Sequence, residues 1–227
     1  LSSQGHQPML SVSGRYVIAF NGEIYNHLAL RKELDFPPSS HIASSGGQRG
    51  VSWRGHSDTE MLLAGFDAWG IQRTVERAIG MFAFAVWDRH TSTLTLGRDR
   101  LGEKPLYYGW QGRGNNAVFL FGSELKALRA HPAFEKNINR AALSLQLRHN
   151  YIPAPHSIYK GIAKLLPGSL LTVSLQQREP KVWAYWSGAK EAEVGSSNTF
   201  IGSADQAVDA LEVLLKDAVR QQMEADV

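Results

Sequence analysis

Residues 20–27 read Phe20-Asn21-Gly22-Glu23-Ile24-Tyr25-Asn26-His27, and they follow an apolar run from Tyr16 that is typical of a buried strand. Asn-Gly is a strong turn signal because both residues tolerate positive φ, so we expect the strand to end abruptly here. A turn alone would explain Asn21 and Gly22. Glu23 lies close to the apolar residues Phe20 and Ile24, so it is harder to explain as an ordinary solvent-exposed side chain. A carboxamide, a glycine N–H and a carboxylate at one strand end can together bind a polar ligand.

The composition excludes several classes of protein. The chain has 227 residues, 43% of them hydrophobic, and a net charge of +3 without a basic stripe. We therefore expect a globular fold and no nucleic-acid partner. No apolar run reaches the ~18 residues that a bilayer requires, so we expect no membrane span.

Cysteine is absent from the sequence, which excludes disulfides, thiolate metal sites and a cysteine nucleophile within these residues. The histidines show no zinc-binding spacing, and no metal site is expected. Patterns typical of serine hydrolases, phosphate-binding loops and dinucleotide sites are also absent. The chain opens on Leu1 in a loop-like stretch, which indicates a piece of a longer protein.

The pattern of apolar residues predicts strands and helices in a mixed order. Paired strands are expected at 80–87 with 93–96, at 106–110 with 117–121, and at 169–174 with 181–185. Helices are expected after Asn26, Ser57, Ser123 and Asn139, each of which can serve as an N-cap, and at 72–78. Pro37-Pro38 ends the first helix, and the Ser/Gly-rich stretch 39–50 reads as a loop of unknown role. This order indicates an α+β fold with mostly antiparallel sheets.

The last part of the chain differs in composition. Residues 188–203 are small and polar, as in a linker. A helix follows, with Ser203 and Gln206 at the spacing of a capping box and an apolar stripe at Val208, Leu211, Leu215 and Val219. Because this helix has no strands of its own, we expect it to begin a second domain.

Asp58 is expected at the first position of a helix, after the cap residue Ser57 and two residues before Glu60. A carboxylate there complements the helix dipole, by ~0.3–1 kcal/mol. The same carboxylate can instead point past the helix end and hold a ligand's ammonium group. The residues alone leave both interpretations open.

The run from Arg98 to Gly109 is dense in charge, Gly, Pro and aromatic residues, and it lies between two expected strands. It reads either as a solvated loop or as a fixed corner in which Arg98 and Asp99 satisfy backbone groups. Neither interpretation makes it catalytic.

Seven runs occur in order along the chain: Gly5-His-Gln-Pro-Met9, Phe20-Asn-Gly-Glu-Ile-Tyr-Asn26, Ser57-Asp-Thr-Glu60, Gly80-Met-Phe-Ala-Phe-Ala85, Arg98-Asp-Arg-Leu-Gly-Glu-Lys-Pro-Leu-Tyr-Tyr108, Ser123-Glu-Leu-Lys126 and Pro167-Gly168. Taken together, they resemble one family: the glutaminase domain of glutamine-hydrolysing asparagine synthetases, a class II glutamine amidotransferase. The resemblance implies an N-terminal-nucleophile hydrolase-like αββα sandwich of two antiparallel sheets. It also implies a glutaminase domain over 1–187, a linker over 188–203, and the first helix of an ATP-dependent synthetase domain over 204–227.

The resemblance further implies roles for single residues. The Asn21 amide and the Gly22 N–H would form the oxyanion hole for the intermediate at the glutamine carboxamide. Glu23 and Asp58, with Asn21 and Gly22, would bind glutamine, Asp58 facing its ammonium group. In this family an N-terminal cysteine is the nucleophile and an arginine grips the glutamine carboxylate; both would lie upstream of Leu1. ATP and Mg²⁺ would act in the missing synthetase domain, so this chain alone is expected to be inactive and to need no cofactor.

The parent implied by the resemblance hydrolyses glutamine and channels ammonia to an ATP-activated aspartate. An amidotransferase for another acceptor, such as a sugar-polymer or peptide precursor, remains an alternative. So does a non-catalytic glutamine-binding relative that never had the cysteine. A cytoplasmic location follows from the implied dependence on ATP and glutamine. A homodimer is one open option for the assembly of the parent protein.

Overall fold

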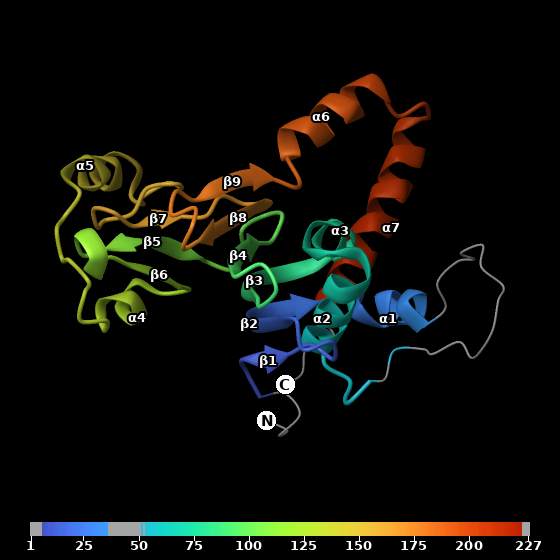
Figure 1. The fold of residues 1–227 in the computed structure, drawn as a ribbon. Coiled ribbons are helices and arrows are strands. Elements are labelled where there is room, and N and C mark those ends of the chain that lie inside the picture. Colours follow the sequence, from blue (N-terminus) through green and yellow to red (C-terminus); the bar gives the residue numbers. More distant parts are fainter. Residues whose placement is uncertain (1–5, 36–50, 52, 224–227) are drawn as a thin grey trace, which may run out of the picture.

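The computed structural model describes residues 6–35, 51 and 53–223, which form two antiparallel sheets with helices on both outer faces (Figure 1). The strands are β1 Met9–Leu10, β2 Tyr16–Ile24, β3 Gly80–Asp88, β4 Thr93–Arg98, β5 Tyr107–Gln111, β6 Val118–Gly122, β7 Ala163–Lys164, β8 Ser169–Ser174 and β9 Lys181–Ala184. The helices are α1 His27–Asp35, α2 Asp58–Trp69, α3 Ile71–Arg77, α4 Leu125–Arg129, α5 Arg140–His149, α6 Gly188–Ser197 and α7 Ala204–Gln222, with a 3₁₀ turn at Gly114–Asn116. The expectations for Pro37-Pro38 and for 39–50 lie outside the described residues.

The larger sheet has six strands in the order β1-β2-β3-β4-β8-β9, and the smaller has three in the order β6-β5-β7. All the pairs are antiparallel, and each hairpin expected from the sequence is present. At the centre of the large sheet, β3 is buried continuously from Phe82 to Val86, because both of its faces are covered.

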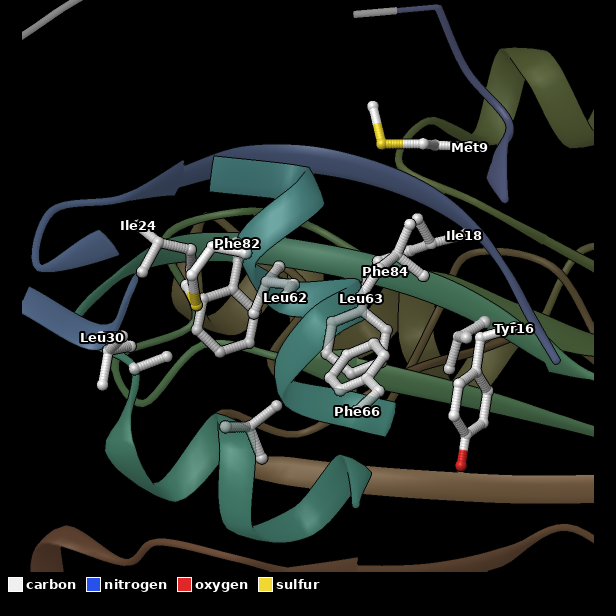
Figure 2. Close-up of a cluster of buried hydrophobic side chains, with 14 of the residues drawn as sticks. Met9, Tyr16, Ile18, Ile24, Leu30, Leu62, Leu63, Phe66, Phe82 and Phe84 are labelled. Carbon is white, nitrogen blue, oxygen red and sulfur yellow. The ribbon is translucent and has the colours of Figure 1, made fainter. Parts of the chain in front are cut away.

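One core lies between the large sheet and the helices α1, α2 and α3. Figure 2 shows Phe82 and Phe84 of β3 beside Leu62, Leu63 and Phe66 of α2. All five residues keep at most 1% of their surface exposed, and Leu62 keeps none. Burying a Leu or Phe side chain fully stabilises the folded state by roughly 1.5–3 kcal/mol, so this cluster fixes α2 firmly on the sheet.

Two further clusters define the remaining layers. Leu96, Leu165 and Leu171 pack between the sheets, and Leu128 of α4 packs with Phe134 and Ile162 on the far side of the small sheet. The order helix, sheet, sheet, helix confirms the expected αββα sandwich of two antiparallel sheets.

The predicted turn at Asn21-Gly22 is wrong. Strand β2 continues through both residues and pairs with β3 as far as Ile24, opposite Gly80. Gly22 is required for a different reason: with φ of +157°, a Cβ there would lie 2.1 Å from the Met81 carbonyl oxygen. Glycine therefore permits close approach of two strands at this point.

Two helices have features that the sequence interpretation did not include. The expected linker is helical over Gly188–Ser197, which its small polar residues did not predict. Helix α5 is capped by Asn139 as expected, and its Leu143 and Leu147 are 41% and 78% exposed, so these two apolar residues do not face the core.

Helix α7 carries the predicted capping box, and both its hydrogen bonds are present. Its stripe of Val208, Leu211, Leu215 and Val219 is at least 55% exposed at every position. Among the described residues, no helix is long and apolar enough to span a bilayer.

Candidate functional site

The outer edge of β2 places backbone N–H groups in a row. The Phe20 N–H donates to the Gln7 side-chain oxygen at 2.5 Å, and the Ile24 N–H donates to Asp58 Oδ2 at 2.9 Å. N–H groups of alternate residues in a strand point to the same edge, so the Gly22 N–H is directed between these two. β1 pairs with β2 only as far as Ile18, so no strand among the described residues pairs with this part of the edge.

Asp58 is the first residue of α2, as predicted, and it ties that helix to the end of β2. Ser57 caps the helix by accepting from the Glu60 N–H at 3.2 Å. Asp58 Oδ1 accepts from the Thr59 N–H at 2.6 Å, while Oδ2 takes the Ile24 N–H. This bond across 34 residues ties the carboxylate to the backbone N–H of the residue that follows Glu23.

Glu60 lies three residues after Ser57, at the spacing of a capping box, but the box is not completed. The Glu60 carboxylate accepts instead from the N–H groups of Arg54, at 2.6 Å, and Gly55, at 3.0 Å. The Gly55 carbonyl accepts in turn from Arg31, whose guanidinium lies 3.9 Å from the centre of the Trp53 ring. Glu60 therefore fixes the segment that leads into Asp58.

Asn21 points its side chain to the other sheet, where its Nδ2 donates to Ser123 Oγ at 3.1 Å. Both residues line a hollow of about 160 Å³, together with Gln7, Leu106 and Phe121. The sequence placed Ser123 as the N-cap of α4, but that cap is Glu124, and no side chain bonds there. Sequence reasoning missed Ser123 as a site residue, because its position next to a helix had an adequate local explanation. It missed Gln7 as well, although the run 5–9 was part of the recognised pattern.

Asn26 also has a tertiary role where a local one was predicted. Its Oδ1 accepts from the Ile79 N–H at 2.9 Å and its Nδ2 donates to the Arg77 carbonyl at 3.0 Å. The Tyr25 N–H donates to the Ile79 carbonyl at 2.8 Å. These bonds hold the segment after β2 to the start of β3. Asn26 directly precedes α1, as predicted, and its carbonyl accepts from the Ala29 and Leu30 N–H groups, but its side chain makes the contact with Arg77 and Ile79.

The site has an acidic character. Burial raises the pKa of the Tyr25 hydroxyl, and the nearby carboxylates of Glu103, Glu23 and Asp99 raise it further. With Asp58 at the same strand end, negative charge gathers where an ammonium group would be stabilised.

The run after β4 is a fixed corner, which confirms that interpretation over a solvated loop. Asp99, 1% exposed, accepts from the N–H groups of Phe82, Leu101, Glu103 and Lys104 at 2.9–3.2 Å. The Arg98 guanidinium donates to the carbonyls of Lys104, Leu165 and Gly102 at 2.6–2.8 Å. Both charged side chains satisfy backbone groups, and none of these bonds is aimed at a ligand. Within the described part of the chain, no cluster of three or more metal-binding side chains is present.

Residues 1–186 match the family described as glutamine amidotransferase domain. The chain is 36% identical to "Asparagine synthetase [glutamine-hydrolyzing] 3" of Bacillus subtilis (strain 168), over 98% of this chain and 33% of that protein. It is 33% identical to "Putative asparagine synthetase [glutamine-hydrolyzing]" of Mycobacterium bovis, over 99% of this chain and 32% of that protein. The chain therefore spans about a third of the length of the curated relatives it matches.

Among solved structures, the chain resembles glutamine phosphoribosylpyrophosphate amidotransferase of B. subtilis complexed with ADP and GMP. The TM-score is 0.54 at 17% identity, covering 82% of this chain and 33% of that one. At such identity the likeness concerns the fold alone. It agrees with the expected sandwich of two antiparallel sheets between helices.

Proposed function

The chain belongs to the glutamine amidotransferase domain family, and from this premise we propose that it is the glutaminase half of a glutamine-dependent asparagine synthetase. In this role the domain hydrolyses glutamine and passes ammonia to an aspartate activated by ATP. The names of the relatives support this proposal. The structural observation that carries it is the bond between Asp58 and the Ile24 N–H, because it joins the proposed ammonium-binding carboxylate to the strand that carries Asn21, Gly22 and Glu23.

The reaction assigns one task to each group. A tetrahedral intermediate at the glutamine carboxamide develops negative charge on oxygen, which the Asn21 Nδ2 and the Gly22 N–H would stabilise. Glu23 and Asp58 would hold the amino-acid end of glutamine, Asp58 facing its ammonium group. Asp58 Oδ2 accepts from the Ile24 N–H, and Oδ1 accepts from the Thr59 N–H and hydroxyl. A carboxylate has about four acceptor positions, so one on Oδ2 is left for an ammonium group.

The proposal extends to the rest of the protein. Residues 1–187 form the glutaminase domain, 188–203 connect it, and 204–227 begin the synthetase domain, where ATP and Mg²⁺ would act in a cytoplasmic enzyme. The exposed apolar stripe of α7 supports this division, because Leu211 and Leu215 are 55% and 57% exposed and a larger domain would cover them.

The experiment is to follow glutamate release from glutamine in the longest protein that contains this chain, with Asn21→Ala and Asp58→Asn variants. We expect Asn21→Ala to lower kcat by ~10²–10³ and Asp58→Asn chiefly to raise KM. ATP cleavage measured with aspartate and with other carboxylate acceptors then identifies the acceptor. Glutamine binding without glutamate release would support a non-catalytic relative and overturn the proposal.

A further inference from the structure

Ser123 connects two segments that are far apart in sequence. It follows β6 of the small sheet, and its Oγ accepts a hydrogen bond from Asn21 of β2 in the large sheet, 102 residues away. It is half-buried, and it lines the same hollow as Asn21. The contact thus joins the two sheets at the proposed oxyanion hole.

Asn21 needs such a partner because its own side chain is exposed. The terminal torsion of an asparagine is broad, so an exposed carboxamide without a partner samples many orientations. A donor stabilises a transition state efficiently only when its direction is set beforehand. Its NH₂ group has two hydrogens: one given to Ser123 leaves the other for the substrate oxygen.

The backbone around Ser123 is itself held in place. Gly122 pairs with Tyr107 in the small sheet, and a Cβ at Gly122 would lie 2.8 Å from Leu128 of α4. Since Glu124 occupies the cap position of α4, the Ser123 hydroxyl is not required there. The hydroxyl is therefore fixed in position and available to Asn21.

We propose that Ser123 is a positioning residue, which holds the Asn21 carboxamide in the direction that oxyanion stabilisation requires. This inference rests on the proposed function, because it assumes that Asn21 is an oxyanion donor. It predicts a specific pattern. Loss of the Ser123 hydroxyl should reduce turnover more than it reduces glutamine affinity, and a threonine at this position, which keeps the hydroxyl, should retain the turnover of the original protein.

The first test uses this chain and the ¹H–¹⁵N signals of asparagine side chains, with Asn21→Ala to assign the Asn21 pair. Ser123→Ala should change the chemical shifts of the Asn21 NH₂ pair and speed its hydrogen exchange. Ser123→Thr should leave these chemical shifts close to their original values. Ser144→Ala is the matched control, because Ser144 is an exposed serine whose hydroxyl donates to the Ala141 carbonyl within α5. Unchanged Asn21 signals in Ser123→Ala would overturn the inference.

The second test measures glutamine hydrolysis in the longest protein that contains the chain. Ser123→Ala should lower kcat about tenfold, less than the ~10²–10³ for removing a donor, with KM changed less than about twofold. In the Asn21→Ala background the same substitution should add nothing. If Asn21→Ala has no effect, the oxyanion assignment fails; if it does but Ser123→Ala is as active as the original, the positioning role alone fails.

Discussion

Gly22→Ala tests how closely β2 and β3 approach each other. The new Cβ would lie 2.1 Å from the Met81 carbonyl oxygen and 2.6 Å from the Phe82 Cα, which are backbone atoms of the paired strand. Forcing a methyl group into a packed site costs about 1–3 kcal/mol, and the φ of Gly22 adds strain, whereas alanine restricts the unfolded chain by ~0.4–1 kcal/mol. We expect a net loss of about 2–4 kcal/mol in the free energy of unfolding.

The assay is urea unfolding followed by tryptophan fluorescence, for which the chain offers 6 Trp residues. A loss of this size corresponds to a Tm lower by roughly 5–15 °C. Gly195→Ala is the control: it lies in α6 with nothing within 4 Å of its Cβ, and it should stabilise slightly through helix propensity. If the free energy of unfolding of Gly22→Ala lies within ~0.5 kcal/mol of that of the original protein, the close-approach argument is refuted.

Three further predictions concern charge and activity. Asp99→Asn should destabilise the fold by about 3–5 kcal/mol in urea unfolding, because one carbonyl oxygen cannot accept the bonds of four N–H groups; a loss below ~1 kcal/mol would contradict this. Burial alone would raise the pKa of the Asp88 carboxyl, but hydrogen bonds from Arg15 and the His90 N–H lower it to about 2. This group therefore stabilises the fold above its unfolded pKa of ~3.9, and the contribution is lost as the pH falls through the lower folded pKa; Arg15→Ala should flatten the decrease measured by urea unfolding from about pH 5 downward. Finally, the purified chain of this sequence should release no glutamate from glutamine, because it contains no cysteine; glutamate formation above the buffer rate would refute that.

The large elements were predictable because their signals are local. The run from Gly80 to Trp87 carries apolar residues on both faces of the expected strand. It forms a central strand that is buried between helices and the second sheet. Ser57 and Ser203 begin their helices where their side chains predicted. In each case the short-range preference and the tertiary environment agree.

The failures occur where a long-range partner competes with a local preference. Asn-Gly is a turn signal in isolation, but pairing of β2 with β3 through Ile24 overrides it. Asn26 and Ser123 were both placed as N-caps, yet each side chain bonds to a segment far away in sequence. A single sequence shows which residues can form a cap, but it does not show a competing hydrogen-bond partner some 50 or 100 positions distant.

The same competition bears on Asp58. In this fold, buried carboxylates repeatedly hold backbone N–H groups, as Asp99 does for the corner after β4 and Glu60 does for the segment before α2. Asp58 also bonds to backbone N–H groups, so its position alone has a structural explanation. The difference lies in exposure: Asp99 and Glu60 are buried, at 1% and 5%, whereas Asp58 remains half-exposed. A carboxylate that is fixed by the backbone and still accessible is preorganised for a ligand, so the structural role of Asp58 is compatible with the proposed contact to an ammonium group.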